Sequence, residues 1–414
     1  MLPREWLEWH GKPVVGMTND DNSYDIIFHL FGEQRIPSLL GVKQFSSKKH
    51  IFVNSKQYPS DVMKEFLRGT EYGEITVDPY KPENVYSMIR EEINKMPSHV
   101  KIGFNLTGGT KLMYIGAYNA CMKENATPFY FDMRNNQVVF LRDYKRSETV
   151  SISSVEDFIR LNAGDGLSAQ NVNYQKKLQE IKDREELTNK MWEKRSDLSK
   201  FYQNTRDNNE GFKPFEYDNE KNIYFKLSKD KSVKVNIDRQ QFEYKEWPNF
   251  ATYCYGGWFE EYIFLKLQPL VDSGFIKDMR IGFHITYKES SVDKNTGHKA
   301  RDRNWKELLK NQIGNLYNEF DILLTDGRRL YIIECKAGRY NKSDKVEEYI
   351  NKLSNTVNTY GGSDGMGFLV SCFDVTNNVS KKKIDENKNI RFVFGDEVVD
   401  LLKKEIIQSK ERCL

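Results

Sequence analysis

The stretch VKIGFNLTGGTKLMYIGAYNACMKEN, residues 100–125, joins an apolar run to a helix-like segment through two threonines and two glycines. The apolar run Val100–Leu106 predicts a buried strand, and the small residues lie where that strand turns into a helix. A strand-to-helix turn of this kind exposes backbone N–H groups at the positive end of a helix dipole, where a phosphate can bind. The spacing is not that of a common nucleotide-binding loop, because Lys111 follows both glycines and Thr110.

The segments around this stretch predict a Rossmann-like, doubly wound α/β domain. Residues 25–31, 50–54, 74–78 and 127–132 are further strand candidates, and helix-length segments such as 59–69 and 82–96 separate them. Strands that alternate with helices form a parallel sheet covered on both faces. Ligands of such sheets bind beyond the carboxyl ends of the strands, where the strand order reverses. Two loops lie there, FGEQRIPSLL (residues 31–40) after the first strand and TGGTK (residues 107–111) after the fourth.

Composition narrows the class of protein. A chain of 414 residues is long enough for two or three domains. Its 63 basic and 60 acidic residues leave a formal charge of +3, so no overall field attracts nucleic acid or membranes. The five cysteines include no C-x-x-C pair, which argues against disulfides and structural zinc and favours reduced, mostly buried thiols. Without a long apolar stretch or a signal core, we expect a cytoplasmic protein with no membrane partner.

The middle of the chain predicts a connection to a second domain. Residues 171–209 are strongly charged and carry apolar residues at roughly helical intervals, which predicts one or two amphipathic helices. Residues 212–237 predict short antiparallel strands, and a second globular region starts near Tyr244. The expected organisation is therefore a leader of unassigned role (1–24), a ligand-sensing α/β domain (25–150), a helical connector with short strands (151–243) and a second domain (244–414).

The most informative stretch of the second domain is NEFDILLTDGRRLYIIECKAG, residues 318–338. The dipeptide Asp326-Gly327 between two apolar runs predicts a β-hairpin with a two-residue turn. That turn would place Asp321 opposite Ile332 and on the same face as Glu334 and Lys336, since side chains alternate along a strand. Asp321 and Glu334 would then be diagonal neighbours, ~7–8 Å apart, and two carboxylates at that separation can hold one cation.

This set of side chains suits the hydrolysis of a phosphodiester. Carboxylates bind Mg²⁺ or Mn²⁺ through oxygen, such a metal polarises the phosphoryl group and activates water, and Lys336 can position that water or stabilise the developing charge. Upstream, GGWFEEYIFLKL (residues 256–267) predicts a helix that carries two adjacent glutamates. Adjacent helical residues point ~100° apart, so only one of them faces the metal. We expect this to be Glu260 rather than Glu261.

These residues resemble the PD-(D/E)xK nuclease superfamily. In that superfamily an acidic residue lies at the start of a β-hairpin, E-x-K lies on its second strand, and a helical glutamate precedes both. The resemblance implies a restriction-endonuclease-like α/β domain whose catalytic residues are Glu260, Asp321, Glu334 and Lys336. It implies metal ligation by Asp321, Glu334 and Glu260.

From about Asp25 to Leu402 the chain resembles the CRISPR-associated Rossmann-fold (CARF) nucleases, ancillary effectors of type III CRISPR systems. In that family the first domain binds a cyclic oligoadenylate, usually cyclic tetra-adenylate, across a homodimer interface, and binding activates the nuclease. The ligand-binding residues implied here are Gly32, Glu33, Gln34, Arg35, Asn105, Thr107, Gly108, Gly109, Thr110 and Lys111. The resemblance leaves the leader before Asp25 without a role.

The sequence does not decide between DNA and RNA as the substrate. The basic run KNTGHKARDRNWK (residues 294–306) can line a path to the metal through phosphate contacts that do not read sequence. The family resemblance implies nicking of DNA, cleavage of single strands, cleavage of RNA, or a mixture. Two alternatives stay open. One is a ligand-gated regulator that binds nucleic acid without cutting it, and the other is a sensor domain that also degrades the cyclic messenger.

Overall fold

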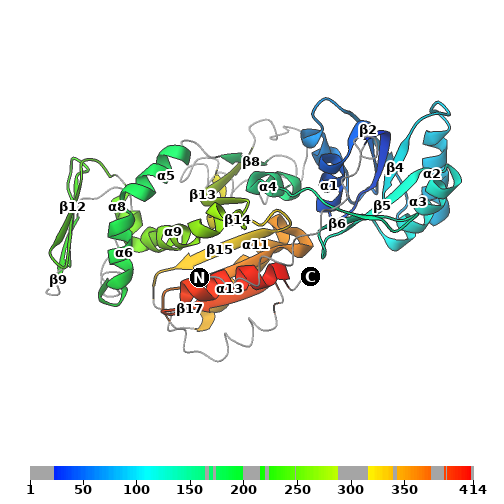
Figure 1. Ribbon diagram of the computed structural model, residues 1–414. Helices are drawn as coiled ribbons and strands as arrows, with labels where there is room; N and C mark the ends of the chain where they lie inside the picture. The colour runs from blue at the N-terminus through cyan, green and yellow to red at the C-terminus, as the bar shows by residue number, and fades with distance from the viewer. Residues whose placement is uncertain are drawn as a thin grey trace. The chain divides into compact units, whose positions relative to one another are not determined.

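The structure is a computed structural model that describes residues 23–163, 167–170, 174–198, 215–219, 223–247, 249–287, 316–338, 343–373, 387 and 389–411 (Figure 1). The chain divides after Ser151 into two compact units, and the second spans Ile152–Arg412. The basic run at 294–306 lies outside the described residues. So does most of the leader, since the description begins at Ser23, the first residue of β1.

The first unit is built on a seven-stranded sheet with the order β3-β2-β1-β4-β5-β6-β7. Its strands are β1 (Ser23–Leu30), β2 (Ser46–Asn54), β3 (Glu71–Thr76), β4 (Ile102–Asn105), β5 (Thr127–Asp132), β6 (Gln137–Phe140) and β7 (Arg146–Glu148). β1 to β5 are paired in parallel, and β6 and β7 extend the sheet in antiparallel pairing. The predicted parallel sheet is therefore confirmed. Its strand order reverses at β1, which lies between β2 and β4.

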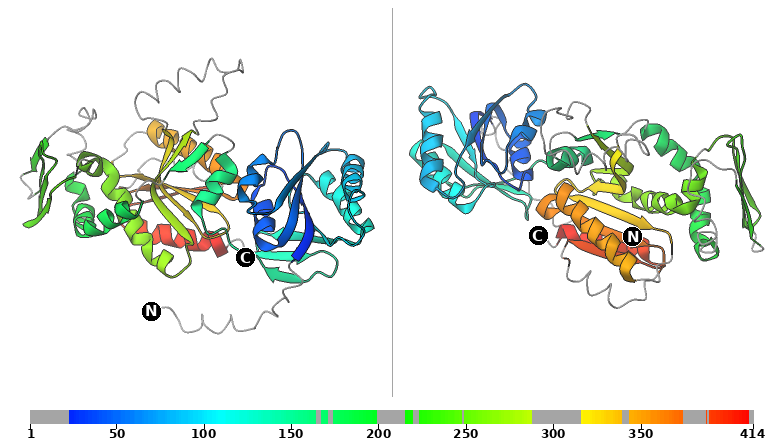
Figure 2. Two further views of the ribbon diagram at one scale, coloured as in Figure 1. Left: turned by 90° about the horizontal axis from the view of Figure 1, so that it is seen from above. Right: turned by 180° about the vertical axis from the view of Figure 1, so that it is seen from behind.

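Helices cover both faces of this sheet (Figure 2). They are α1 (Ile36–Gln44), α2 (Pro82–Ile93) and α3 (Lys111–Lys123), with a short 3₁₀ helix, η3 (Asp61–Phe66). α2 and α3 pack in one apolar cluster with Phe28 and Phe104. α1 lies on the opposite face, where a Cβ at Gly41 would be 2.7 Å from His29. Side chains alternate along β1, so Phe28 and His29 point to opposite faces.

Two local predictions in this unit were wrong. The segment 31–40 was expected to be a loop, but the loop ends at Arg35 and α1 begins at Ile36, with Pro37 in its first turn. Proline favours this position because its missing N–H has no intrahelical partner there. The segment 59–69 was expected to be helix-length, but it forms only η3.

The second unit contains a six-stranded sheet, β17-β16-β15-β14-β13-β8, and an antiparallel four-stranded sheet, β12-β11-β10-β9. The strands are β8 (Leu167–Gln170), β9 (Phe215–Asn219), β10 (Ile223–Leu227), β11 (Val233–Ile237), β12 (Gln240–Tyr244), β13 (Asp278–Tyr287), β14 (Leu316–Thr325), β15 (Leu330–Lys336), β16 (Met366–Ser371) and β17 (Ile390–Phe394). The helical segments are α4 (Val155–Ala163), α5 (Tyr174–Asp183), α6 (Glu185–Glu193), α8 (Phe250–Thr252), η5 (Tyr253–Gly257), α9 (Trp258–Asp272), α11 (Ser343–Tyr360), η7 (Gly362–Asp364) and α13 (Val398–Glu411).

The helices expected between the two domains belong to the core of the second unit. α5 and α6 bury Ile181 and Leu187, and β10 buries Ile223, in one cluster with Trp258 of α9 and Ile333 of β15. The predicted amphipathic helices and the predicted antiparallel strands are both present. Because they share this core, the described part of residues 152–243 is a packed portion of the second unit.

The β14–β15 hairpin has a longer turn than predicted. Thr325 pairs with Leu330 and Ile322 with Ile333, so four residues form the loop instead of two. Asp326 accounts for the difference, because its buried carboxylate accepts hydrogen bonds from the backbone N–H groups of Arg328 and Arg329 at 2.9 and 3.1 Å. The shift from the predicted register is two residues, and a shift of two leaves every side chain on its original face.

Four of the five cysteines lie in the described residues, and all four are buried free thiols, as expected. They are Cys121, Cys254, Cys335 and Cys372. Within the described ranges, no helix combines the length and apolarity that a membrane crossing requires.

Candidate functional site

Three predicted catalytic side chains converge beyond the last pairs of the β14–β15 hairpin. Lys336 Nζ lies 2.6 Å from Glu334 Oε1 and 3.9 Å from Asp321 Oδ2. Asp321 Oδ2 accepts a hydrogen bond from the backbone N–H of Cys335 at 2.7 Å. With the corrected register, Asp321 and Glu334 are the next residues beyond the pair Ile322–Ile333, so they are direct rather than diagonal neighbours.

The carboxylates of this site repel one another in a largely desolvated setting. The side chains of Asp321, Glu334 and Lys336 are only 16–18% exposed. Burial raises the pKa of Asp321 well above its usual value, and the charges of Glu334 and Glu260 raise it further. Burial also raises the pKa of Glu260 to about 7, with a smaller contribution from Glu319. Carboxylates held together against their own repulsion favour a bound cation.

Of the two glutamates in the first turn of α9, Glu260 is the one coupled to this site. Glu261 is 8% exposed, and its two oxygens accept hydrogen bonds from Arg184 Nε and Nη2 at 2.7 and 2.5 Å. Glu260 interacts electrostatically with Glu334 and Lys336. The adjacent carboxylates therefore have different roles, with Glu261 in an internal ion pair and Glu260 at the acidic cluster.

The donor types fit Mg²⁺ or Mn²⁺, although they do not form a complete cage. In the parts of the chain that the structure describes, no three His, Cys, Asp or Glu side chains are close enough to enclose a metal ion. Mg²⁺ commonly keeps several waters and takes one or two carboxylates together with the phosphates of its substrate. Asp321 and Glu334 are compatible with such a two-carboxylate site.

In the first unit, the two predicted ligand loops lie side by side at the reversal of strand order. A Cβ at Gly32 would be 3.3 Å from Gly109 Cα, and a Cβ at Gly108 would be 2.0 Å from the Leu30 carbonyl oxygen. Gly109 has a φ of +73°, which non-glycine residues rarely adopt. The two glycines of TGGTK therefore allow this loop to contact the end of β1 and the loop that follows it.

Asn105 connects the Thr107–Lys111 loop to the start of α1, the helix that follows the Gly32–Arg35 loop. It is 1% exposed, and its Oδ1 accepts hydrogen bonds from Thr107 N at 3.2 Å and Thr107 Oγ1 at 2.8 Å. Its Nδ2 donates to the Pro37 carbonyl in the first turn of α1 at 2.9 Å. Asn105 stays a predicted ligand residue. In the structure its buried side chain ties the loop at Thr107 to the first turn of α1.

The threonines of the loop are also engaged in internal contacts. Thr110 Oγ1 accepts a hydrogen bond from Met113 N at 3.1 Å as the N-cap of α3, and it donates to the Pro79 carbonyl at 2.5 Å. Thr107 Oγ1 accepts from Phe131 N at 2.8 Å. Lys111, Glu33 and Gln34 are exposed, by contrast, and are available to a ligand.

Sequence reasoning missed a buried histidine pair that supports Asn105. His29 Nε2 lies 2.9 Å from His50 Nδ1, and His29 Nδ1 lies 3.3 Å from Asn105 Nδ2. Burial lowers the pKa of both imidazoles, that of His50 to about 4. The sequence does place these histidines beside apolar residues, in FHLF and HIFV. A histidine inside a buried strand needs a polar partner, so this pattern could have indicated the pair.

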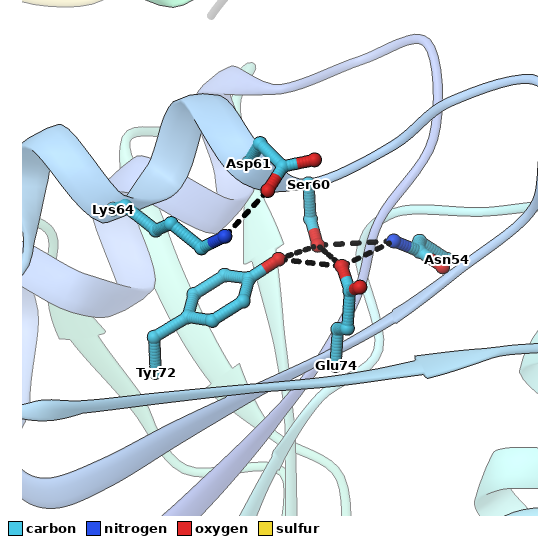
Figure 3. Close-up of polar contacts among 6 residues, drawn as sticks. All are labelled: Asn54, Ser60, Asp61, Lys64, Tyr72 and Glu74. Carbon is cyan, nitrogen blue, oxygen red and sulfur yellow. Dashed lines mark hydrogen bonds and ion pairs between the residues drawn. The ribbon is translucent and has the colours of Figure 1, made fainter.

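A second unpredicted polar cluster lies on β2, β3 and the start of η3 (Figure 3). Tyr72 OH donates to Glu74 Oε2 at 2.7 Å, Ser60 Oγ lies 2.7 Å from Tyr72 OH, and Asn54 Nδ2 donates to Ser60 Oγ at 3.0 Å. Ser60 and Asn54 are almost completely buried. These contacts attach the start of η3 to the last residue of β2 and to Tyr72 and Glu74 of β3.

A comparison with known protein families matches the N-terminal part of the chain. Residues 26–161 match the family model described as the Card1 CARF domain. This match agrees with the expected CARF domain. No curated protein matches the chain.

Solved structures share the fold over both units. Can2 from Sulfobacillus thermosulfidooxidans, in complex with cyclic tetra-adenylate, is 16% identical with a TM-score of 0.64, covering 94% of this chain and 97% of Can2. Protein VC1899 from Vibrio cholerae is 15% identical with a TM-score of 0.64, covering 94% and 98%. A type III CRISPR defence DNA nuclease activated by cyclic oligoadenylate is 13% identical with a TM-score of 0.54, covering 92% of this chain but 51% of that nuclease.

Proposed function

We propose that this protein is a metal-dependent endonuclease of type III CRISPR defence, activated by cyclic tetra-adenylate. The observation that carries the proposal is the convergence of Asp321, Glu334 and Lys336, with Glu260 coupled to them, in a chain whose first unit is a CARF domain. This is the residue set of a PD-(D/E)xK nuclease. Fold likeness to Can2 bound to cyclic tetra-adenylate, and to the DNA nuclease activated by cyclic oligoadenylate, supports the combination.

The messenger is proposed to bind over the loops Gly32–Arg35 and Thr107–Lys111. The N-terminus of α3 points its dipole toward this site, and exposed Lys111 adds a full positive charge. A phosphate of the ring is the natural partner for both. The buried Asn105 ties the second of these loops to the first turn of α1, and its proposed contribution to binding is to hold that loop in place.

In the proposed reaction the acidic cluster performs the chemistry. Asp321 and Glu334 would hold Mg²⁺ or Mn²⁺, which when bound polarises a phosphodiester and lowers the pKa of water. Lys336, already within 4 Å of both carboxylates, is placed to stabilise charge that develops on the phosphate. Glu260, which is electrostatically coupled to Glu334 and Lys336, would add a third carboxylate to the surroundings of the metal.

We further propose that the protein acts in the cytoplasm as a homodimer joined through α3. This helix exposes Leu112, Ile115 and Met122 by 36, 47 and 42%, and it follows directly from the proposed ligand loop. A cyclic messenger with two-fold symmetry suits a site made of one loop set from each of two identical chains. The α3 side chains would form part of that isologous contact.

The direct test is a cleavage assay with plasmid DNA, single-stranded DNA and single-stranded RNA, with and without cyclic tetra-adenylate and Mn²⁺. Cleavage that requires both additions and is lost in Glu334→Ala would support the proposal. Nucleic-acid binding without cleavage would instead favour a ligand-gated regulator. Incubating labelled cyclic tetra-adenylate with Glu334→Ala protein tests whether the first unit degrades the messenger.

A further inference from the structure

A second lysine approaches the acidic cluster from a different element. Lys177 lies on α5, and its half-buried ammonium group occupies the space beside Gly282 of β13. A Cβ at Gly282 would be only 2.1 Å from Lys177 Nζ. Any side chain at position 282 would therefore displace the ammonium group.

Gly282 is level with Asp321 on the adjacent strand. The register pairs Ile281–Ile322 and Phe283–Phe320 lie on either side of this position. Gly282 has a φ of +56°, so glycine is favoured there by the backbone conformation as well as by the neighbouring ammonium group. The space for Lys177 is thus built into β13 next to a proposed catalytic carboxylate.

The surroundings of Lys177 are acidic, yet they do not hold it in an ion pair. Lys177 interacts electrostatically with Glu260 and Glu319. Within the described ranges, however, no carboxylate oxygen lies within 4 Å of its Nζ, whereas Lys336 Nζ has two such contacts. A half-buried ammonium group without a close anion is costly, and that cost falls when an anionic ligand binds.

We propose that Lys177 is a second substrate-binding lysine of the cleavage site, whose ammonium group contacts a phosphate of a DNA backbone. This inference rests on the proposed nuclease function. Lys336 on β15 and Lys177 on α5 would then supply positive charge to the polyanion from two different elements. The contact is to phosphate and does not read the base sequence.

The test uses the full-length protein and a fluorescently labelled duplex DNA, with binding followed by anisotropy in EDTA at several NaCl concentrations. Lys177→Met keeps the aliphatic stem and removes the charge. One charge-assisted contact accounts for roughly a 10- to 150-fold change in Kd. The slope of log Kd against log[NaCl] should fall by ~0.9, the signature of one lost phosphate contact. Lys177→Arg should restore most of the affinity.

The matched control is Lys176→Met on the same helix. Lys176 is 77% exposed and pairs with Glu180 at 3.8 Å, so its removal takes away the same charge from outside the site. Gly282→Ala offers an independent test, since it displaces the Lys177 ammonium group without changing the net charge. It should weaken binding in the same direction, provided that tryptophan fluorescence shows a folded second unit.

The binding and cleavage measurements test the role of Lys177 and the nuclease function separately. Unchanged Kd and salt slope in Lys177→Met, or equal losses in Lys176→Met, would overturn the role of Lys177. With Mn²⁺ and cyclic tetra-adenylate present, plasmid cleavage by Lys177→Met should fall in parallel with its affinity. If the wild-type protein binds DNA through Lys177 but never cleaves it, the nuclease assignment fails while the phosphate contact stands. If Lys177→Met lost more affinity for a labelled RNA of matching sequence than for the DNA, DNA would be contradicted as the ligand of Lys177.

Discussion

Arg184 and Glu261 form a two-pronged ion pair inside the second unit, with N–O distances of 2.7 and 2.5 Å. Both side chains are about one-tenth exposed, and the guanidinium carbon of Arg184 lies 4.9 Å from the centre of the Trp247 ring. The pair joins the α5–α6 junction to α9. It occupies Glu261 fully, so the neighbouring residue, Glu260, is the glutamate available to the acidic cluster.

The two adjacent glutamates should therefore respond differently to mutation. Glu261→Ala leaves Arg184 buried without its partner, which typically costs about 3–5 kcal/mol of unfolding free energy. Glu260→Gln should not lower stability, because it removes a carboxylate that neighbouring carboxylates repel. It should abolish most of the cleavage. Urea unfolding followed by tryptophan fluorescence, together with a plasmid-cleavage assay, checks both. A stable Glu261→Ala, or a fully active Glu260→Gln, would reverse the assignment.

Cleavage should require a divalent metal and Glu334. Glu334→Ala removes a proposed ligand, so activity should fall to background while the affinity for cyclic tetra-adenylate stays the same. EDTA should act on the wild-type protein in the same way. Glu348→Ala, at an exposed position on α11, is the matched control and should cleave normally. Full activity of Glu334→Ala in a titration with Mn²⁺ would remove this residue from the site.

Lys111 and Thr110 are adjacent, yet their alanine variants should fail for different reasons. Lys111→Ala removes an exposed charge, and its affinity for the ring should fall roughly 10- to 150-fold with stability unchanged. Thr110→Ala removes the N-cap of α3 and the contact to the Pro79 carbonyl, at a cost of about 0.5–2 kcal/mol of stability. Its loss of ring affinity should be smaller and should follow from a disturbed loop. Titration calorimetry and thermal unfolding separate the two effects, and unchanged affinity in Lys111→Ala would place the ligand elsewhere.

A charge on the outer face of α3 should dissociate the proposed dimer. Ile115 is 47% exposed, and Ile115→Glu would bury a carboxylate in the contact. Sedimentation should then show a monomer that binds the ring weakly and is poorly activated. Ser87→Glu adds the same charge at an exposed position on α2 and should remain dimeric. For the wild type we expect one ring per two chains, so a stoichiometry of one ring per chain would contradict the shared site.

The buried histidines should make the first unit sensitive to acid. The pKa of His50 falls from 6.5 to about 4 on folding because burial disfavours its charged form. Above about pH 6.5 the imidazole is neutral in both states, so the stability is complete there. As the pH falls from 6.5 toward 4, only the unfolded state gains the proton, and up to about 3 kcal/mol is lost through His50. Urea unfolding at several pH values, followed by hydrogen-exchange mass spectrometry of β1 and β2, should show this loss. An equal pH dependence in His50→Gln would exclude His50 as its source.

The sequence by itself determined the features that depend on neighbouring residues. The apolar run Val100–Leu106, the glycines after it and Pro82 at the start of α2 indicated a parallel sheet with a glycine loop at a strand end, and the structure has this arrangement. The hairpin containing Asp321 and Glu334 was also predictable, because strand alternation has a fixed period of two. The same period explains why an error of two residues in the register left the acidic residues on one face.

Tertiary structure decided which polar side chains are available for function. Asn105, Thr107 and Thr110 are predicted ligand residues, and in the structure they also hydrogen-bond to Pro37, Phe131 and Pro79, which come from distant parts of the chain. The choice between Glu260 and Glu261 depended on Arg184, 77 residues away from Glu261. Lys177 is recognisable only beside Gly282, since a lysine in a charged helix has no local feature that marks it. Hydrogen bonds and ion pairs act over a few ångströms in space, so a pattern read along the chain cannot assign partners that folding brings together.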